Sequence, residues 1–285
     1  MPQHKALNLF APIREQATAY FRACGISWHQ HANHALSSQV SCINFLMPLA
    51  TQPALLSRVI GKALGIAPPA MLPVESGPDG SPWFVGFEWI GCEDYLTEAG
   101  RSGTRTRGAN ATSADAIVRF ETAGGIETAL IEWKYTESYG APIPTRGNDV
   151  RVARYKDLAF APNGPVRTDT GLTISDFFWE PFYQLLRQQM LAFRMQAASE
   201  HHTTRVRVLH VAPSANLALH NVTAPALQHR GSDAFDVFRG LLVRPDDFVS
   251  RSTEAVFGEA LSDAVGDSLA WAAYLRERYQ WVCRD

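Results

Sequence analysis

Paired cysteines and long apolar runs are both absent from this sequence of 285 residues. Its four cysteines, at positions 24, 42, 92 and 283, lie far apart and form no C-x-x-C pair, which argues against a disulfide framework or a cysteine zinc site. No apolar run approaches the roughly 18 residues of a membrane-spanning helix, and the first residues lack a signal-peptide segment. We therefore expect a cytoplasmic protein that does not bind a membrane.

A strong net charge is lacking as well, because the formal sum at pH 7 is −2. A protein that binds DNA without sequence preference would gain affinity from many Lys and Arg on a broad surface. Basic residues gather only locally: segment 101–156 carries nine Lys or Arg against six Asp or Glu, whereas segment 231–285 carries six against ten. Because chance produces such imbalances too, this pattern supports DNA binding only weakly.

The motifs of three common enzyme classes are also missing, namely G-x-S-x-G, the P-loop and G-x-G-x-x-G. Three histidines stand close together at positions 29, 31 and 34, but no nearby Asp or Glu completes a set of metal ligands. We interpret these histidines as solvated or capping side chains at the start of a helix.

Hydrophobic residues make up 46 % of the sequence, enough for the core of a single domain over 1–285. Helical spacing of apolar residues predicts helices at 6–23, 34–49 and 54–64, and hence an N-terminal helical region over about 1–70. Further helices are predicted at 148–160, 181–198 and 263–281, the last within a helical C-terminal region over about 230–285. Strands are predicted near 84–90, 115–121, 126–136 and 204–212.

The central feature of the chain is a predicted hairpin of two apolar strands. A two-residue loop at Ala123-Gly124 would place Asp115 opposite Glu132, and one at Gly124-Gly125 would place it opposite Lys134. Because side chains alternate along a strand, both registers put the two carboxylates and the ammonium on one face. The other face is apolar and predicts packing on a layer of helices; it carries Ala116, Val118, Phe120, Ala129, Ile131, Trp133 and Tyr135.

An Asp followed at hairpin distance by Glu-x-Lys on an apolar strand resembles the PD-(D/E)XK nuclease superfamily, and in particular its restriction-endonuclease-like members. Segments 107–113, 132–137 and 183–189 resemble one bacterial subgroup of type II restriction endonucleases, and the likeness covers roughly residues 30–215. One departure is Ala114, which stands where the motif has proline. The resemblance implies an α/β fold with a restriction-endonuclease-like mixed central β-sheet flanked by α-helices.

The resemblance also implies the roles of the site residues. Asp115 and Glu132 would hold Mg²⁺, for which Mn²⁺ can substitute, with the backbone carbonyl of Trp133 as a further ligand. Lys134 would position or deprotonate the attacking water, or stabilise the pentavalent oxyanion, and the sequence leaves these roles open. Gln184 matches a glutamine that approaches the site in several branches; the alternative is an amide on the helix surface.

Two further groups of residues remain open. Many members of the superfamily add an acidic residue upstream of the Asp, and Glu88 and Glu98 are both candidates, although either can be a surface charge. Candidate contacts to DNA are Arg105 and Arg107, which precede the hairpin, and Arg151 and Arg154 on the helix predicted at 148–160. For the helix arginines, simple solvation is the alternative explanation.

These features together predict a Mg²⁺-dependent endodeoxyribonuclease of restriction type that cuts duplex DNA, with a homodimer supplying one site for each strand. A first alternative is a nuclease fold retained as a DNA-binding or assembly module without catalysis. Such a module would tolerate the loss of Asp115, Glu132 or Lys134, but all three are present. A second is a glycoside hydrolase that uses Asp115 and Glu132 as an acid and base pair, but that chemistry needs neither the lysine nor a divalent ion.

Overall fold

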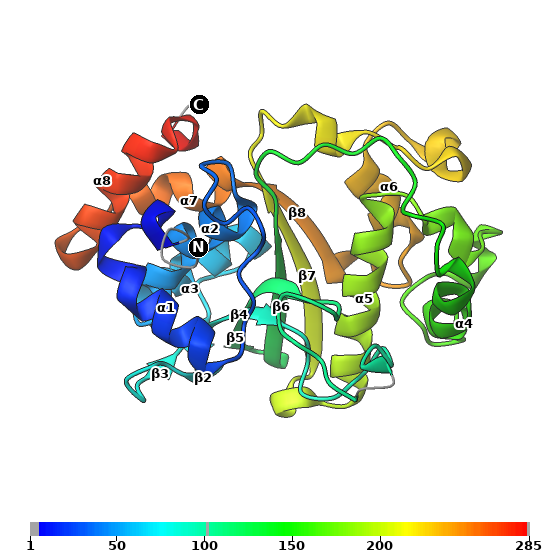
Figure 1. The fold of residues 1–285 in the computed structure, drawn as a ribbon, viewed down its shortest axis with the longest axis horizontal. Coiled ribbons are helices and arrows are strands. Elements are labelled where there is room, and N and C mark those ends of the chain that lie inside the picture. The colour runs from blue at the N-terminus through cyan, green and yellow to red at the C-terminus, as the bar shows by residue number, and fades with distance from the viewer. Residues whose placement is uncertain (1–5, 101–102, 284–285) are drawn as a thin grey trace.

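The computed structural model describes residues 6–100 and 103–283. Within these residues the fold is a mixed α/β arrangement, in which one central sheet lies between two layers of helices (Figure 1). This arrangement confirms the fold class predicted from the sequence. None of the described helices is long and apolar enough to cross a bilayer.

The central sheet is mixed and is built around the predicted hairpin. Its strands are β1 (Ala70–Leu72), β4 (Val85–Trp89), β5 (Ala114–Thr122), β6 (Gly125–Trp133), β7 (Arg205–Ala212) and β8 (Phe248–Ser252). Their order is β1-β5-β6-β7-β8, and β4 also pairs with β5. Strands β1, β4 and β6 are antiparallel to β5, whereas β6, β7 and β8 run parallel to one another. A separate two-stranded sheet joins β2 (Glu75–Ser76) to β3 (Pro82–Trp83).

The helices fall into two layers, one on each face of the sheet (Figure 1). The first layer holds α1 (Arg14–Ala23), α2 (Ser38–Leu46), α3 (Pro53–Leu64), α7 (Thr253–Ser262) and α8 (Leu269–Arg278); the second holds α4 (Asn148–Ala159), α5 (Phe182–Ala197) and α6 (Ala234–Leu241). Short 3-10 helices are η2 (Ala11–Ile13), η3 (Met47–Leu49), η5 (Thr168–Thr170), η6 (Ile174–Phe177), η7 (Glu200–His202), η8 (Leu217–His220), η9 (Pro225–Arg230), η10 (Pro245–Asp247), η11 (Gly266–Ser268) and η12 (Gln280–Cys283).

The hairpin adopts the first of its two predicted registers. Thr122 pairs with Gly125, so the loop consists of residues 123 and 124, and the pairing extends to Ala116 opposite Ile131. Gly125 has a φ of 111°, a conformation that a residue with a side chain rarely adopts. The glycine pair therefore fixes the loop length, and the loop length fixes which charges meet at the other end of the hairpin.

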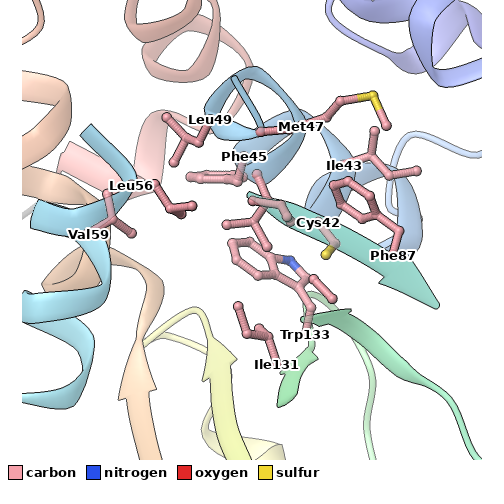
Figure 2. Packing of buried hydrophobic residues seen from close by; sticks show 14 of the residues in the cluster. Cys42, Ile43, Phe45, Met47, Leu49, Leu56, Val59, Phe87, Ile131 and Trp133 are labelled. Carbon is pink, nitrogen blue, oxygen red and sulfur yellow. The ribbon is translucent and has the colours of Figure 1, made fainter. Parts of the chain in front are cut away.

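The apolar face of the hairpin packs on the first helix layer, as predicted. Trp133 is 1 % exposed, and the centre of its ring lies 5.1 Å from that of Phe45 on α2. Figure 2 shows both rings within the cluster of buried hydrophobic residues. The indole N–H of Trp133 donates to Ser41 Oγ at 3.2 Å, so its polar atom is satisfied. Burying side chains of this size stabilises the fold by about 1.5–3 kcal/mol each. The core thus holds the end of β6 in place.

Local sequence signals set several helix ends. Ser37 caps α2 by accepting the backbone N–H of Val40 at 3.4 Å. Helix α3 begins with Pro53 and ends at Gly65, whose φ of 67° is the left-handed conformation that favours glycine. Helices α3, α4 and α5 thus lie close to where the sequence predicts them.

Other predicted elements need correction. The helix predicted at 6–23 begins only at Arg14, and the one predicted at 263–281 is confined to Leu269–Arg278. The segment near 230–285, expected to be helical, also contains strand β8, which pairs with β7 and forms an edge of the sheet. Strand β6 ends at Trp133 rather than at residue 136, so Lys134 follows the strand directly.

Candidate active site

The hairpin brings Asp115 and Glu132 together at its open end. Because Ala116 pairs with Ile131, the next residues outward, Asp115 and Glu132, stand opposite each other. The backbone N–H of Trp133 donates a hydrogen bond of 2.7 Å to Asp115 Oδ2 and so orients that carboxylate. Glu132 faces the second helix layer, where Gln188 contacts it, whereas Asp115 lies between the layers and lines cavities with Gln188 of α5 and with Cys42 of α2.

Lys134 neutralises Glu132. Its backbone N–H donates to the carbonyl of Val211 on β7 at 2.8 Å, which fixes the residue at the end of the sheet. Its ammonium nitrogen Nζ lies 2.5 Å from Glu132 Oε1, in an ion pair whose side chains are 11 % and 1 % exposed. Burial, the largest single influence, would lower the pKa of Lys134, but the charges of Glu132, Asp115 and other neighbours together raise that pKa well above its ordinary value. The lysine is therefore an ammonium ion at neutral pH.

The carboxyl of Asp115 is hard to ionise. Burial raises its pKa well above the ordinary range and the charge of Glu132 raises it further, although Lys134 opposes both effects. Burial also raises the pKa of Glu132, again against the influence of Lys134. One ammonium group thus faces two carboxylates. Ionising both leaves excess negative charge, which a bound cation would compensate.

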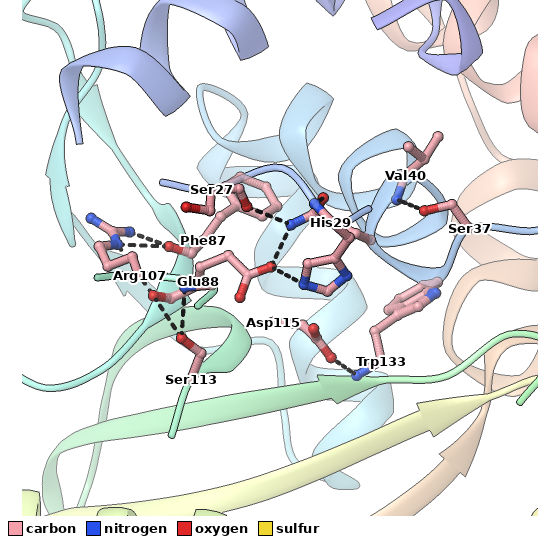
Figure 3. A network of polar contacts seen from close by, with 12 residues as sticks. Ser27, His29, Ser37, Val40, Phe87, Glu88, Arg107, Ser113, Asp115 and Trp133 are labelled. Carbon is pink, nitrogen blue, oxygen red and sulfur yellow. Dashed lines mark hydrogen bonds and ion pairs between the residues drawn. The ribbon is translucent and has the colours of Figure 1, made fainter. Parts of the chain in front are cut away.

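A third carboxylate, that of Glu88 on β4, enters from the neighbouring strand, and Figure 3 shows it beside the His29 ring with Asp115 nearby. Glu88 has a φ of 50°, a left-handed conformation that costs about 1–3 kcal/mol and is common at functional sites. Its Oε1 accepts a 2.7 Å hydrogen bond from Gln39 Nε2 and lies 3.3 Å from His29 Nε2. Its charge adds to burial in raising the pKa of Asp115.

Glu98, the other upstream candidate, belongs to a separate network. Its Oε1 lies 3.1 Å from Arg187 Nη2 and accepts hydrogen bonds from the Tyr155 hydroxyl at 2.6 Å and from Thr112 Oγ1 at 2.8 Å. Burial would raise the pKa of Glu98, but Arg187 and these hydrogen bonds lower it below its ordinary value. Of the two candidates, the structure therefore brings Glu88 to Asp115 and uses Glu98 to anchor Arg187.

The amide that contacts the carboxylate pair is Gln188 on α5. Its Nε2 donates to Glu132 Oε2 and to the Ser113 carbonyl, the latter at 2.8 Å. Its Oε1 is buried and, within the described part of the chain, makes no hydrogen bond. Gln184, the glutamine predicted from the sequence, lies one turn earlier on the same helix face and lines the same cleft. The spacing of four residues was the signal that could have identified Gln188.

These residues open onto a cleft of about 190 Å³ between β4, the loop before β5 and α5. His29, Glu88, Asp115, Gln184, Arg187 and Gln188 line it, together with residues 108, 109 and 111–113. Gly108 has a φ of 73°, and a Cβ there would lie 3.0 Å from the Ser27 carbonyl and 3.1 Å from the Glu88 carboxyl carbon. Glycine is required at this position because the loop passes so close to the acidic group.

The carboxylates of the cleft, together with Glu132, which does not line the cleft but contacts Gln188, fit a hard divalent cation. Each oxygen of Glu132 has one contact, Oε1 with Lys134 and Oε2 with Gln188, and so retains a lone pair. The unpartnered Oε1 of Gln188 supplies a buried acceptor for a water molecule in the hydration shell of such an ion. Oxygen donors and excess negative charge are what Mg²⁺ and Mn²⁺ prefer. The Trp133 carbonyl as a further ligand stays a prediction.

Arg105 and Arg107, predicted as DNA contacts, use their guanidinium groups inside the protein. Arg105 donates to the carbonyls of Ile90 at 2.6 Å and Gly91 at 3.2 Å. Arg107 makes two contacts with the Glu75 carboxylate, at 3.0 and 3.1 Å. Both arginines therefore hold the loop that leads into β5, and contact with DNA stays a prediction for both.

The two arginines predicted as DNA contacts on α4 are half-buried. Arg151 donates to the Pro144 carbonyl at 2.7 Å and to Asn148 Oδ1 at 2.8 Å, which ties the helix to the chain before it. The guanidinium carbon of Arg154 lies 5.8 Å from the centre of the Tyr155 ring. Their contact with DNA also stays a prediction.

The model of the REase-ARP family, described as "Restriction Endonuclease associating with ARP", matches residues 2–280. Searches of curated proteins and of solved structures found no significant match. The family match spans the whole hairpin, the helices of both layers and β8. The chain therefore belongs to the REase-ARP family, whose members are of restriction-endonuclease type.

Proposed function

We propose that this protein is a metal-dependent endodeoxyribonuclease of the PD-(D/E)XK type, and that it cleaves duplex DNA as a restriction enzyme. The observation that carries the proposal is the meeting of Asp115, Glu132 and Lys134 at one end of the hairpin, with Glu88 beside them. The membership of the REase-ARP family supports a nuclease of restriction type. DNA is the partner that this class of enzyme implies.

Asp115, Glu132 and the Trp133 carbonyl would hold the Mg²⁺ ion, for which Mn²⁺ can substitute, and Glu88 would add negative charge beside Asp115. When bound, the ion supplies charge stabilisation to the phosphoryl oxygens and lowers the pKa of a bound water. Asp115 is kept in place by the Trp133 N–H, at 2.7 Å. Gln188 holds Glu132 from α5, so both carboxylates are oriented before a ligand arrives.

Lys134 would act as a charged hydrogen-bond donor. Three roles follow from the motif: positioning the water, deprotonating it, and stabilising the oxyanion. Because Glu132 raises the pKa of Lys134 against the effect of burial, its ammonium form dominates at neutral pH and has no free lone pair to accept a proton. Its raised pKa therefore favours positioning the water and stabilising the pentavalent oxyanion.

The observed site fits a glycoside hydrolase poorly. Such an enzyme needs a carboxylic acid that protonates a sugar oxygen, which the raised pKa of Asp115 would allow, and a second carboxylate open to water or to the sugar. Here Glu132 is 1 % exposed and is paired with Lys134 at 2.5 Å, so it is neither free nor open to a sugar ring. A nuclease fold without catalysis remains the alternative that experiment must decide.

The proposed assembly follows from the proposed reaction. Cutting both strands of a duplex calls for two sites, which a homodimer would supply by symmetry. The family description also names ARP as an associated component, and we propose the same association for this chain. Copurification of ARP with the tagged protein, and sedimentation of the free protein, test these two statements separately.

The decisive experiment incubates the purified protein with unmethylated genomic DNA, with either Mg²⁺ or EDTA. Lys134→Ala should slow cleavage by about 100- to 1,000-fold, the range for removing one donor that stabilises an oxyanion. Lys62→Ala is the matched control, because Lys62 is an exposed lysine on α3 paired with a surface glutamate. Discrete fragments that disappear in Lys134→Ala support a restriction enzyme, and a smear supports a non-specific nuclease. No cleavage of any DNA would leave the binding-module alternative.

A further inference from the structure

A second group of side chains that could hold a metal ion lies where the chain leaves β4 and α5. Cys92 follows β4, and Glu200 and His201 belong to η7, directly after α5. The ligand atoms of these three residues all lie within 4.8 Å of one another. Cys92 is exposed, His201 is half-buried and Glu200 is buried, so the group is open to solvent on one side. Its members are far apart in the sequence, which is why no spacing motif predicts it.

The separation of the donor atoms matches one tetrahedral ion. Cys92 Sγ lies 3.7 Å from His201 Nε2. A thiolate and an imidazole bound to the same zinc ion, with bonds of about 2.3 and 2.0 Å at a tetrahedral angle, lie about 3.5 Å apart. A weak thiol–imidazole hydrogen bond explains this distance too, so the case for an ion also rests on the adjacent carboxylate and on the backbone that presents the histidine.

Glu200 is oriented by partners of its own, as metal ligands usually are. Its Oε1 accepts a hydrogen bond from the Trp89 indole N–H at 3.0 Å, and its Oε2 accepts one from the Cys92 backbone N–H at 2.8 Å. The Tyr95 hydroxyl and the Cys92 thiol also hydrogen-bond to this carboxylate, so a cation would take the place of the thiol proton between Cys92 and Glu200. The backbone of His201 is fixed as well, since its carbonyl accepts a hydrogen bond from Arg119 Nη2 at 2.7 Å. Such outer contacts fix the ligands before an ion arrives.

The chain is strained where it presents the histidine. Ser199, His201 and His202 have φ values of 50°, 53° and 62°, three left-handed residues within four positions, and none is glycine. Each costs about 1–3 kcal/mol unless the surroundings fix it, and such residues concentrate at ligand sites. The strain thus accompanies the turn that places the imidazole against the thiol.

We propose that Cys92, Glu200 and His201 bind one Zn²⁺ ion, with water as its fourth ligand. Thiolate and imidazole donors favour zinc over Mg²⁺, which prefers oxygen, so this site and the carboxylate site would take different ions. The ion would connect the chain after β4 to the end of α5. These two elements carry Glu88 and Gln188, and the zinc would therefore stabilise the cleft without touching the substrate. The inference does not depend on nuclease activity.

The test titrates metal-free wild-type protein with Co²⁺, which reports on zinc sites through its absorption. A sulfur-to-cobalt charge-transfer band and intense d–d bands are expected, and Zn²⁺ should displace both. Cys92→Ser should abolish the charge-transfer band. His201→Asn should weaken binding by more than about 100-fold, since even outer partners of metal ligands contribute about 10- to 100-fold. Asparagine is chosen because it tolerates the left-handed conformation.

Matched controls are His202→Asn, the adjacent left-handed histidine outside the group, and Cys283→Ser, the other exposed cysteine. Both should keep the wild-type spectrum and a stoichiometry of one. A second measurement needs no variant: Zn²⁺ should slow alkylation of Cys92 in the wild type, mapped by mass spectrometry, at least tenfold more than that of Cys283. The proposal is overturned if the sulfur band is missing, if it persists in Cys92→Ser, or if zinc leaves the alkylation of Cys92 unchanged.

Discussion

The buried ion pair between Lys134 and Glu132 permits a quantitative test of the site. Lys134→Met removes the ammonium and keeps a long apolar side chain, so Glu132, 1 % exposed, is left without its counter-charge. Removing one partner of a buried pair costs about 3–5 kcal/mol. We therefore expect the free energy of unfolding at pH 8 to fall by about that amount, as measured by urea denaturation in EDTA. An exposed pair is worth only about 0–1 kcal/mol.

The stability that Lys134→Met loses should depend on pH in a defined direction. Burial raises the pKa of Glu132, and Lys134 now opposes that shift, so the pKa should rise further in Lys134→Met. A carboxyl whose pKa is raised in the folded protein contributes stability below its unfolded pKa, and that stability is lost as the pH rises through the folded value. The variant should therefore lose little stability at pH 5 and most at pH 8. Denaturation at both values measures the difference.

Two comparisons make the test decisive. Lys62→Met breaks an exposed pair with Glu259, 3.2 Å long and with side chains 55 % and 60 % exposed, and should cost less than about 1 kcal/mol. In a double-mutant cycle with Glu132→Gln, the coupling energy should be well above the roughly 0.5 kcal/mol that independent sites show. The reasoning is refuted if Lys134→Met costs no more than Lys62→Met, or if the cycle shows no coupling.

Three further predictions concern the same cleft. Asp115→Asn should raise the free energy of unfolding at pH 8 in EDTA. The pKa of Asp115 is raised in the folded protein, so its ionisation destabilises the fold as the pH rises. Urea denaturation that shows equal or lower stability for the variant would contradict this. Glu88→Gln should weaken Mg²⁺ binding in calorimetry more than Glu98→Gln does, and equal effects would remove Glu88 from the site. Gln188→Leu should slow DNA cleavage by about 10- to 100-fold, more than Gln184→Leu, because Gln188 touches the buried carboxylate; the reverse order would favour Gln184.

The sequence predicted the hairpin because local signals dominate there. The glycine pair and the alternation of apolar residues determine the two strands and their faces, and those faces hold in the structure. The register stayed open, since both loops satisfy the same pattern. The structure settles it through Thr122 paired with Gly125, which sets Asp115 opposite Glu132. The sequence therefore predicted that Asp115, Glu132 and Lys134 lie together, but not which of the other two stands opposite Asp115.

Contacts between distant segments were the part that the sequence could not supply. Strand β8 is short and gains its stability from β7, some 40 residues earlier, so its own residues carry little signal. His29, in the segment before α2, meets Glu88 on β4 only in the folded structure. From the sequence, Arg105 and Arg107 are expected to be surface charges next to the motif. In the structure, Arg105 donates to backbone carbonyls and Arg107 to the Glu75 carboxylate, inside the fold. Charge alone does not distinguish these two uses of arginine.

Calorimetric titration of the metal-free protein with Mg²⁺ tests most directly whether the carboxylates of the hairpin form a metal site. The wild type should bind at this site, and Asp115→Asn should lose that binding while keeping the hydrogen bond from Trp133. Asp267→Asn, which changes an exposed aspartate in η11, is the matched control and should bind like the wild type. Equal Mg²⁺ binding by the wild type and by Asp115→Asn would contradict the metal site, and with it the proposed chemistry.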